Sequence, residues 1–600
     1  MKLSDYVADF LAGLSVRDIF LISGGGMMHL LDSVGKHPAI RLVCNLNEQA
    51  SSICADSAGQ YTGNLGVCLL TTGPGGTNAM TGVAASYLDS TPVLVISGQC
   101  KTADFASRRG VRSFGAQEVD VTAMARPVTK YAVTVTDPDS IRYHLEKAVY
   151  LARHGRKGPV WVDVPLDVQG AQIDPSALRS FSPEQEGLTA PPPDFSGPVQ
   201  ETYALLQAAR RPAVLIGGGL VLSGAREEFL ELCGRLQIPV LSTWRAKDVL
   251  PHDDPLYFGM PGIPAPRYAN YILQNCDFLL ILGTRLNPAL TAYDEPHFAF
   301  QAKKVMVDID EKEIEKLDMP FALTVAADAG DFVRAMLAQA NPPAGNSAQE
   351  WLAFCRKMKQ KYPLENERQP LDNEGLTDGY RLAREISRQS RPEDVFVGSS
   401  SGRTCGISHM ALELKSGQRF ISSMGLGSMG FTVPSAIACC LASGRRTIAL
   451  EGDGSLQHNL QELQLIQTYQ LPVKLFILSN RGYASIYMMQ KNNFQSRFAA
   501  CDPATHVVFP SLRDVAGTYG LDYLCIPDNS HIPGTVRDAL KDNRPVLCEV
   551  LSSIYFDEIP KSKTIAHPDG TFSSCPLENL YPFVSEEEQR ENMPDWGDTP

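Results

Sequence analysis

The sequence contains no long hydrophobic run, and its first residues lack the pattern of a secretory signal. The longest apolar stretches, such as residues 276–283, fall far short of the roughly 18 residues that a membrane-spanning helix needs. The first ten residues do not combine a basic segment with a following apolar stretch. We therefore expect no transmembrane helix and no secretion, and we predict a cytoplasmic protein.

Basic blocks and metal-binding spacings are also missing. With 54 Lys and Arg against 67 Asp and Glu, the net charge is −13 and the pI is about 5.4. An acidic chain without a basic cluster is a poor partner for nucleic acids or anionic membranes. The 14 cysteines include no Cys-x-x-Cys pair, and the 11 histidines show no metal-ligand spacing. These absences favour reduced thiols and argue against nucleic-acid and membrane partners, while small anionic ligands stay open.

What the chain does contain is the composition of an ordinary globular protein. Its 600 residues are 44% hydrophobic and 20% charged, enough for several domains with buried cores. Three stretches alternate β-branched apolar runs with amphipathic helical patterns, which is typical of parallel α/β units. We expect domains over residues 1–180, 190–345 and 370–555, followed by a polar tail over 556–600. The predicted fold class is α/β, with three doubly wound parallel-sheet domains.

The strongest chemical signal is a Gly-Asp-Gly turn at 452–454 followed by Asn480. The turn follows a predicted strand at 447–450, and Asn480 follows another at 473–478. Parallel neighbours end at one sheet edge, where ligands of open α/β sheets bind. The oxygens of Asp453 and Asn480 suit Mg²⁺, and the flanking glycines and a helix predicted over 457–469 suit a phosphate. The alternative is a plain Asp-Gly turn beside an unrelated asparagine; the strand context and spacing favour a magnesium–diphosphate site.

This pairing resembles the motif of thiamine-diphosphate (ThDP) enzymes, and nearly the whole chain resembles the acetolactate-synthase-like branch of that family. The resembling segments are residues 22–26, 47–50, 72–78, 117–120, 126–130, 158–165 and 424–430. The resemblance implies an N-terminal pyrimidine-binding domain, a central domain and a C-terminal diphosphate-binding domain. It also implies that two subunits close around each cofactor, so that the protein is a homodimer or homotetramer.

The resemblance assigns roles at the pyrimidine end of the cofactor. Glu48 would hydrogen-bond N1′ of the aminopyrimidine and drive its acid–base chemistry, although an acid in a first helical turn is also favourable by itself. Gly25 and Gly26 would bring backbone amides to a developing oxyanion. Gln117 would reach the active site, its alternative being an exposed loop residue. The implied catalytic residues are Glu48, Gln117, Gly25 and Gly26, and the implied pyrimidine contacts are Glu48, Thr72, Pro74 and Asn78.

Further roles follow at the diphosphate end. The carbonyl of Gly427 would accept a bond from the 4′-amine and Met429 would wedge beneath the cofactor, the alternative being a core methionine in a tight turn. The other implied cofactor contacts are Ser400, Ser401, Gly402, Gly452, Asp453, Gly454, Ser455, Asn480, Gly482 and Tyr483. The implied Mg²⁺ ligands are Asp453, Asn480 and Gly482. FAD, which some relatives bind in the central domain, is left open as a structural ligand. The three glycines at 217–219 form no dinucleotide motif, and residues 284–288 stand where acetolactate synthases carry an Arg-Phe-Asp-Asp-Arg-like run.

Several departures from authentic acetolactate synthases concern the substrate. Asn47 stands where they carry histidine, Met489 replaces a tryptophan, Ala116 a phenylalanine and Leu166 a lysine. We therefore expect a pocket of different shape and polarity. Its candidate residues are His458, Tyr483, Tyr487 and Met488.

The functional hypothesis is a ThDP- and Mg²⁺-dependent lyase or transferase. It would decarboxylate a 2-oxo acid, with pyruvate as the expected donor, and transfer the acyl carbanion to a carbonyl acceptor in an acetolactate-synthase-like carboligation. One alternative is a ThDP-dependent hydrolase of a 1,2-dicarbonyl, or a simple 2-oxo acid decarboxylase. A second is a catalytically silent regulatory homologue.

Overall fold

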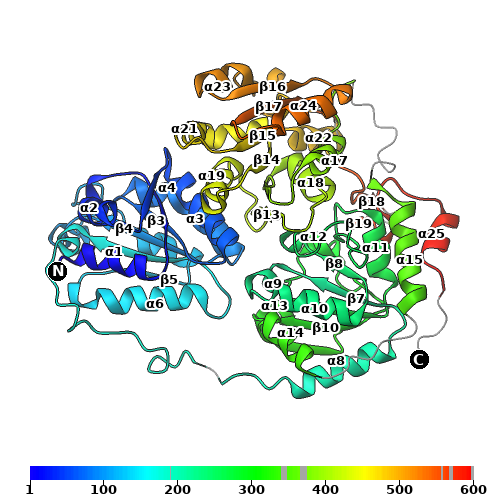
Figure 1. Cartoon of the computed structure of the whole chain (residues 1–600), viewed down its shortest axis with the longest axis horizontal. Coiled ribbons are helices and arrows are strands. Elements are labelled where there is room, and N and C mark those ends of the chain that lie inside the picture. The colour runs from blue at the N-terminus through cyan, green and yellow to red at the C-terminus, as the bar shows by residue number, and fades with distance from the viewer. Residues whose placement is uncertain (190, 340–347, 365–374, 556–557, 567–571, 596–600) are drawn as a thin grey trace.

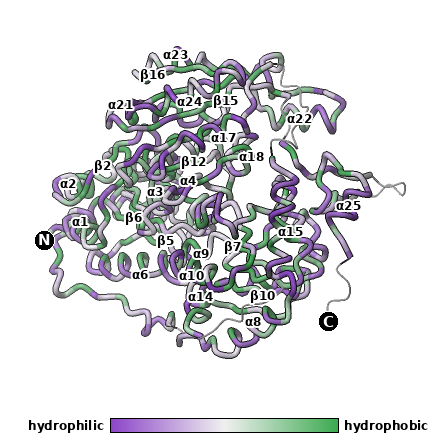
Figure 2. Tube along the Cα trace, turned by 45° about the vertical axis from the view of Figure 1, so that its right-hand side comes forward, coloured by the Kyte–Doolittle hydropathy of each residue, from purple (hydrophilic) through white to green (hydrophobic). Residues whose placement is uncertain are grey.

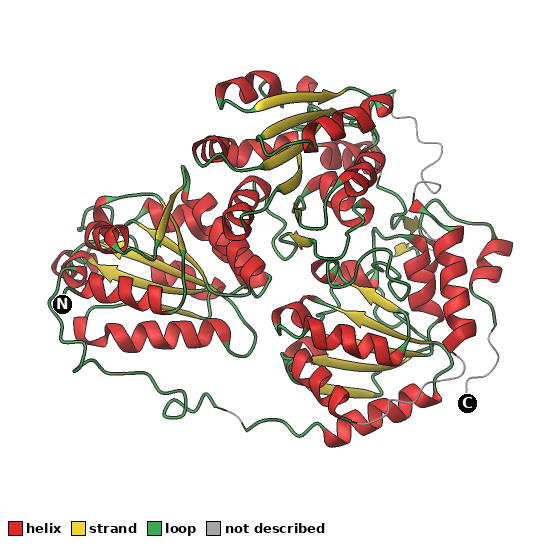
Figure 3. Ribbon diagram, viewed as in Figure 1, coloured by secondary structure: helices red, strands yellow, loops and turns green. Residues whose placement is uncertain are grey.

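A computed structural model describes residues 1–189, 191–339, 348–364, 375–555, 558–566 and 572–595. Three parallel β-sheets, each flanked by helices, make up the body of the chain (Figures 1 and 3). This arrangement confirms the predicted α/β fold class. The expected domain boundaries at 190, 345 and 370 lie outside the described residues. No helix in the described ranges is long and apolar enough to cross a membrane.

The N-terminal sheet has six parallel strands in the order β2-β1-β3-β4-β6-β5. Every residue of β3 and β4 is buried, as expected for strands covered by helices on both faces. The strands are β1 Asp18–Leu21, β2 Arg41–Cys44, β3 Gly66–Leu70, β4 Val93–Gln99, β5 Tyr131–Thr134 and β6 Val160–Pro165. The main helices are α1 Leu3–Gly13, α2 Met28–Lys36, α3 Glu48–Thr62, α4 Pro74–Leu88 and α6 Ile141–Arg153.

The C-terminal sheet repeats this topology, with the order β13-β12-β14-β15-β17-β16. The same strand order in both domains means that the ligand-binding edge of each sheet is built by corresponding loops. The strands are β12 Val395–Val397, β13 Arg419–Ile421, β14 Thr447–Gly452, β15 Val473–Ser479, β16 Asp522–Ile526 and β17 Val546–Leu551. The helices used below are α18 Gly402–Ala411, α19 Thr432–Ser443, α20 Asp453–Leu456, α21 Leu463–Thr468, α22 Ala484–Asn493 and α23 Leu512–Thr518, with the 3₁₀ segment η7 Gln457–Glu462 between α20 and α21.

The central sheet differs, with five parallel strands in the order β11-β10-β9-β7-β8. Its core is mainly aliphatic but includes large aromatic side chains: Phe229, Phe278, Phe332 and Trp351 are almost fully buried. The strands are β7 Pro212–Ile216, β8 Val240–Ser242, β9 Phe278–Leu282, β10 Lys303–Asp308 and β11 Leu323–Ala326. Its main helices are α8 Ser196–Ala208, α10 Arg226–Leu236, α11 Arg267–Asn275, α14 Ala329–Ala338 and α15 Ala348–Lys361.

The N- and C-terminal domains share one apolar core. Helix α3 of the first packs on α19 of the third, and buried residues of both sheets belong to the same cluster. The thiol of Cys54 in α3 donates to the carbonyl of Pro434 in α19, 3.2 Å away. The small residues of α3 let the two helices approach closely, so the N- and C-terminal domains form one packed unit within the chain.

The segment after β17 is an ordered arm rather than only a polar tail. Strands β18 Thr564–Ala566 and β19 Phe572–Ser574 pair antiparallel, and helix α25 Glu586–Asn592 follows. Figure 2 shows α25 as largely hydrophilic, yet Leu577 and Leu580 just before it are buried. Arg267 of α11 donates to the carbonyl of Leu580 at 2.9 Å. The arm thus covers helices of the central domain.

Candidate active site

The Gly-Asp-Gly turn at 452–454 and the residue Asn480 lie where β14 and β15 end side by side. These strands pair in parallel with Gly452 opposite Leu478, so Asp453 and Asn480 emerge at one sheet edge. The Asp453 carboxylate accepts hydrogen bonds from the backbone amides of Gly454 at 2.8 Å and Arg481 at 2.6 Å. The side-chain oxygen of Asn480 accepts from the Gly482 amide at 3.2 Å. The structure therefore brings the predicted metal-ligating residues together.

Asp453 is the residue of this turn that could hold a cation. Its side chain is buried, and burial raises its pKa to about 7, with a further upward effect from Glu549 and an opposing one from the backbone amides. A buried carboxylate in this state gains from a bound divalent ion, because the ion supplies the charge that solvent no longer compensates. Asn480 and the backbone carbonyl of Gly482 are the further oxygen donors at this turn, which matches the preference of Mg²⁺ for few protein ligands.

Two glycines of the turn are required by close packing. A Cβ on Gly454 would lie 2.6 Å from the Tyr483 ring, and one on Gly482 would lie 2.4 Å from the carbonyl oxygen of Cys501. The helical segment begins at Asp453, four residues before the helix predicted over 457–469, and it starts with α20 and the 3₁₀ turn η7. Gly452, Gly454 and Ser455 thus stand at the very start of this segment, although the amides of Gly452 and Gly454 already donate to the carboxylates of Glu451 and Asp453.

Two more loops meet this turn. The Gly427 backbone has φ +67°, and a Cβ there would lie 3.3 Å from the carbonyl oxygen of Ser400. The Gly430 amide donates to the Ser455 hydroxyl at 2.9 Å, which places the loop carrying Met429 beside the Gly-Asp-Gly turn. Ser401 precedes α18, which begins at Gly402. The loops that carry the predicted diphosphate residues therefore meet at one edge of the C-terminal sheet.

Ser428 is a residue that the sequence reasoning missed. Its hydroxyl is buried and has no hydrogen-bond partner among the residues that the structure describes. A buried hydroxyl without a partner costs free energy, so its position between Gly427 and Met429 fits a contact with a polar ligand. The signal was available, since serine stands inside the glycine-rich loop itself.

A second cluster forms at the edge of the N-terminal sheet. Asn47 caps α3, with its side-chain oxygen accepting from the Gln49 amide at 2.8 Å, and Glu48 is the first helical residue. The side-chain amide of Asn78 donates to the Glu48 carboxylate at 3.0 Å. Pro74, exposed at the first position of α4, lies one turn before Asn78. Glu48 and Asn78 are therefore oriented together at the starts of two adjacent helices.

The glycine-rich loop after β1 joins this cluster. A Cβ on Gly26 would lie 1.8 Å from the Thr72 hydroxyl, whereas Gly25 has no atom within 4 Å of that position and faces open space. Gly73 has φ +68°, and a Cβ there would lie 2.4 Å from the carbonyl oxygen of Gln117. Gln117 is exposed. The structure thus brings together the predicted catalytic and pyrimidine-side residues at one edge.

Within one chain the two clusters are held apart by helix α4. Asn78 lies near its beginning, and Asp89 caps its end and accepts from the Gly425 amide at 2.9 Å, two residues before Gly427. At 1.5 Å per residue, the eleven residues from Asn78 to Asp89 span about 16 Å. The acidic side chain and the diphosphate loops of one chain therefore lie at opposite ends of a helix.

The candidate substrate residues divide into two groups. Tyr487 stacks on Phe498 with ring centres 4.1 Å apart, and Tyr487 and Met488 are buried in an apolar cluster with Cys501. These two side chains pack beside α22, and their role in a substrate pocket stays a prediction. Met489, in contrast, is 39% exposed. His458 lies against Gly430, and Tyr483 against Gly454.

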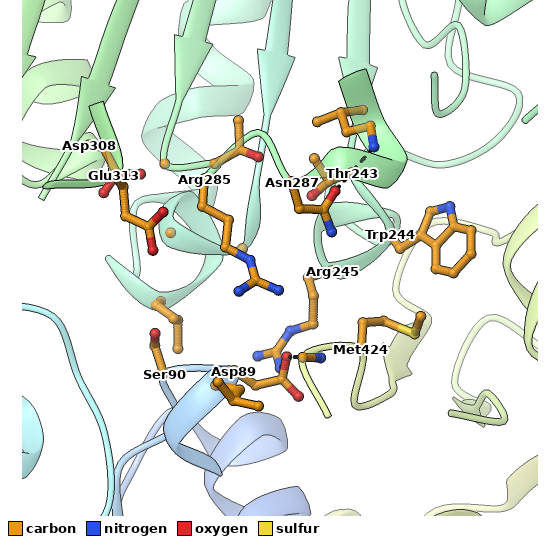
Figure 4. A pocket seen from close by; sticks show the side chains of 18 of the residues that line it. Asp89, Ser90, Thr243, Trp244, Arg245, Arg285, Asn287, Asp308, Glu313 and Met424 are labelled. Atoms are coloured by element: carbon orange, nitrogen blue, oxygen red, sulfur yellow. Dashed lines mark hydrogen bonds and ion pairs between the residues drawn. The ribbon is translucent and has the colours of Figure 1, made fainter. Parts of the chain in front are cut away.

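A cavity of about 330 Å³ lies elsewhere, between the three domains (Figure 4). Its floor is the carboxyl edge of the central sheet, where a Cβ on Gly217 would lie 2.3 Å from the Gly283 carbonyl oxygen. Arg285 and Arg245 extend toward the cavity, and Arg245 pairs with Asp89 at 3.3 Å. Asp89, Asp308 and Glu313 line the cavity as well, so it presents charges of both signs. The sequence had drawn attention only to its glycines and to the segment around Arg285.

Comparisons with known proteins agree with this geometry. Residues 1–124 match the family described as thiamine pyrophosphate enzyme, N-terminal TPP binding domain; residues 199–336 match its central domain, and residues 400–550 its C-terminal TPP binding domain. The chain therefore belongs to the thiamine pyrophosphate enzymes, and the fold and domain matches define it as a ThDP-dependent enzyme of the transferase or lyase type.

The similar curated proteins narrow this class to the acetolactate-synthase-like branch. The chain is 31% identical to the acetolactate synthase large subunit of Cyanidium caldarium, over 90% of this chain and 92% of that one. It is 28% identical to the acetolactate synthase isozyme 1 large subunit of Escherichia coli K12, over 91% and 93%, and 29% identical to the chloroplastic acetolactate synthase 1 of Zea mays, over 92% and 85%. The expected family membership is confirmed.

Proposed function

We propose that this enzyme uses ThDP and Mg²⁺ to decarboxylate a 2-oxo acid, with pyruvate as the donor, and transfers the acyl carbanion to a carbonyl acceptor. The observation that carries the proposal is the Glu48–Asn78 pair, 3.0 Å apart, in a chain whose Asp453–Asn480 turn is also complete. A silent regulatory homologue would have no need to keep both. A cytoplasmic location belongs to the same proposal.

Different residues of the chain would bind Mg²⁺, bind the diphosphate and transfer the proton. Asp453, Asn480 and the Gly482 carbonyl would hold Mg²⁺, and the amides at the start of α20 and α18 would bind the diphosphate. When bound, ThDP supplies the carbanion and the electron sink for loss of CO₂. Glu48 would exchange a proton with the aminopyrimidine ring, and Asn78 fixes the direction of its carboxylate. A positioned acid–base group of this kind contributes about 10²–10⁴-fold to the rate.

The assembly is part of the proposal. Because about 16 Å of helix separates Asn78 from Asp89 within one chain, the ring and the tail of one cofactor are better served by two chains. We propose a homodimer, or a homotetramer built from such dimers, in which the N-terminal domain of one chain faces the C-terminal domain of its partner. FAD is the candidate ligand of the three-domain cavity, where Arg285 and Arg245 are the residues that would hold its phosphates.

Glu48→Gln tests the catalytic assignment. The amide keeps the shape of the side chain but cannot take up the proton, so turnover should fall by about 10²–10⁴-fold while ThDP still binds. Turnover and ThDP affinity are measured on the same preparations. Turnover that stays at the wild-type level would contradict the role of Glu48.

Product analysis tests the reaction class. The enzyme is incubated with pyruvate and a panel of carbonyl acceptors, with and without ThDP and Mg²⁺, and the products are identified by mass spectrometry. Release of CO₂ with a ligated product supports carboligation. A parallel incubation with a cyclic 1,2-dicarbonyl tests the alternative. Formation of a ring-opened acid without release of CO₂ would show hydrolysis in place of carboligation. A visible flavin spectrum of the purified protein would support FAD in the central cavity.

A further inference from the structure

A buried carboxylate of the C-terminal domain holds the turn that precedes Glu48. Glu462, the last residue of η7, is fully buried. One of its oxygens accepts from the backbone amide of Leu46 at 2.9 Å, and the other accepts from the side-chain amide of Asn45 at 3.0 Å. The backbone amide of Asn45 in turn donates to the Leu21 carbonyl at the end of β1, at 2.9 Å. The turn is thus fixed from both sides.

This contact buries a carboxylate between two domains, which is unfavourable in free energy. Burying a carboxylate costs several kcal/mol unless its hydrogen bonds are complete, and burial raises the pKa of Glu462 despite the bonds from Asn45 and Leu46. The side-chain oxygen of Asn45 is also buried, without a hydrogen-bond partner in the described part of the chain. The apolar core shared by α3 and α19 already holds the domains together. The polar contact is therefore not needed to hold the domains together, which indicates that it serves to fix the position of the turn at residues 45–47.

The geometry concerned is that of Glu48. Leu46, Asn47 and Glu48 are consecutive, and Asn47 is the N-cap residue of α3. The Glu48 carboxylate is held at its tip by Asn78, so Glu462 fixes the base of the side chain while Asn78 fixes its end. A misplacement of about 1 Å at a reacting group can cost about 10²-fold in rate.

We propose that Glu462 is a positioning residue for Glu48: its carboxylate locks the turn at residues 45–47 and so sets where the catalytic carboxylate meets the cofactor ring. This rests on the proposed function. Glu462 touches neither substrate nor cofactor; it acts through the backbone that carries Glu48.

Two substitutions separate geometry from charge. Glu462→Ala removes both acceptors from the turn. Glu462→Gln can keep two hydrogen bonds if the Asn45 amide turns over, since the new carbonyl accepts from Leu46 and the new amide donates to the Asn45 oxygen that now lacks a partner. Asp394→Asn is the matched control, because Asp394 is a buried carboxylate that accepts from Arg446 at 2.8 Å just before β12, at the opposite edge of the same sheet.

The readout is the rate at which the C2 proton of bound ThDP exchanges with deuterium, measured at saturating ThDP and Mg²⁺, together with the affinity for ThDP. Glu462→Ala should slow exchange by about 10–100-fold with ThDP affinity nearly unchanged. Glu462→Gln should recover most of the rate, and Asp394→Asn should exchange at the wild-type rate even if it melts earlier.

Several results would overturn the inference. These are wild-type exchange in a folded Glu462→Ala protein, a Glu462→Gln variant as slow as the alanine variant, or equal slowing by Asp394→Asn. If Glu462→Ala does not fold, Asn45→Ala removes one of the two bonds, and an unchanged exchange rate in that variant overturns it as well. Failure of the proposed function is distinguishable, because then the wild-type protein itself would not promote exchange.

Discussion

Gly482→Ala perturbs the metal turn at a point where the structure leaves no room. The new Cβ would lie 2.4 Å from the carbonyl oxygen of Cys501, whereas ordinary contacts begin at 3.4 Å. That carbonyl cannot move aside freely, because it accepts from the Tyr483 amide at 2.8 Å. The backbone at Gly482 must therefore shift by about 1 Å, and its own carbonyl, a proposed Mg²⁺ ligand, shifts with it.

The expected loss of Mg²⁺ affinity follows from the narrow range of ligand distances and angles that the ion accepts. The ion requires ligands at about 2.0–2.1 Å in nearly octahedral geometry, so a carbonyl displaced by about 1 Å is lost as a ligand. We expect Mg²⁺ affinity in the presence of ThDP to fall by about 10–100-fold, the range seen when the surroundings of a metal site are disturbed. Isothermal titration calorimetry of the apoprotein with Mg²⁺ and saturating ThDP measures the change directly.

Gly517→Ala is the control for this experiment. Gly517 lies in helix α23 of the same domain, and no atom lies within 4 Å of the position of a Cβ. Alanine there should leave Mg²⁺ affinity unchanged and stabilise the helix slightly. A folded Gly482→Ala protein with wild-type Mg²⁺ affinity would refute the assignment of this turn, as would equal losses in both variants.

Two further predictions concern stability. Burial raises the pKa of Asp56 to about 6, so its carboxyl contributes stability that is full below about pH 4 and is lost as the pH rises through 6. Asp56→Asn should therefore raise the unfolding temperature at pH 7, by the equivalent of roughly 2–3 kcal/mol at most, with the gain shrinking toward pH 5; a gain independent of pH would contradict this. Leu580→Ala should leave a cavity beneath the C-terminal arm, cost roughly 2–5 kcal/mol and lower the unfolding temperature without changing ThDP affinity. An unchanged unfolding temperature would show that the arm does not stabilise the central domain.

Local signals in the sequence were sufficient for the fold class and for the pairing of Asp453 with Asn480. Each follows a continuous apolar strand, and the carboxyl ends of parallel neighbours meet at one edge, so spacing along the chain translates directly into proximity. The position of Glu48 at the start of a small-residue helix was accessible in the same way, whereas its catalytic role was implied only by the resemblance to ThDP enzymes.

Features that depend on distant contacts were not accessible in this way. The stacking of Tyr487 on Phe498 could not be read from the local sequence, which indicated only that Tyr487 follows the turn. The polar composition of the C-terminal segment concealed the two leucines that fix it to the central domain. Glu462 could not be singled out at all, because its partners Asn45 and Leu46 lie more than 400 positions earlier in the chain.

Mixing two inactive variants tests whether active sites form between chains. Glu48→Gln chains keep a sound diphosphate domain, and Asp453→Ala chains keep a sound pyrimidine domain. Half of randomly mixed dimers are hybrids, and each hybrid has one site built from two intact halves, so the mixture should recover about a quarter of wild-type turnover. Hybrids that stay as inactive as either parent would mean that Glu48 and Asp453 of the same chain serve the same coenzyme, against the arrangement argued above.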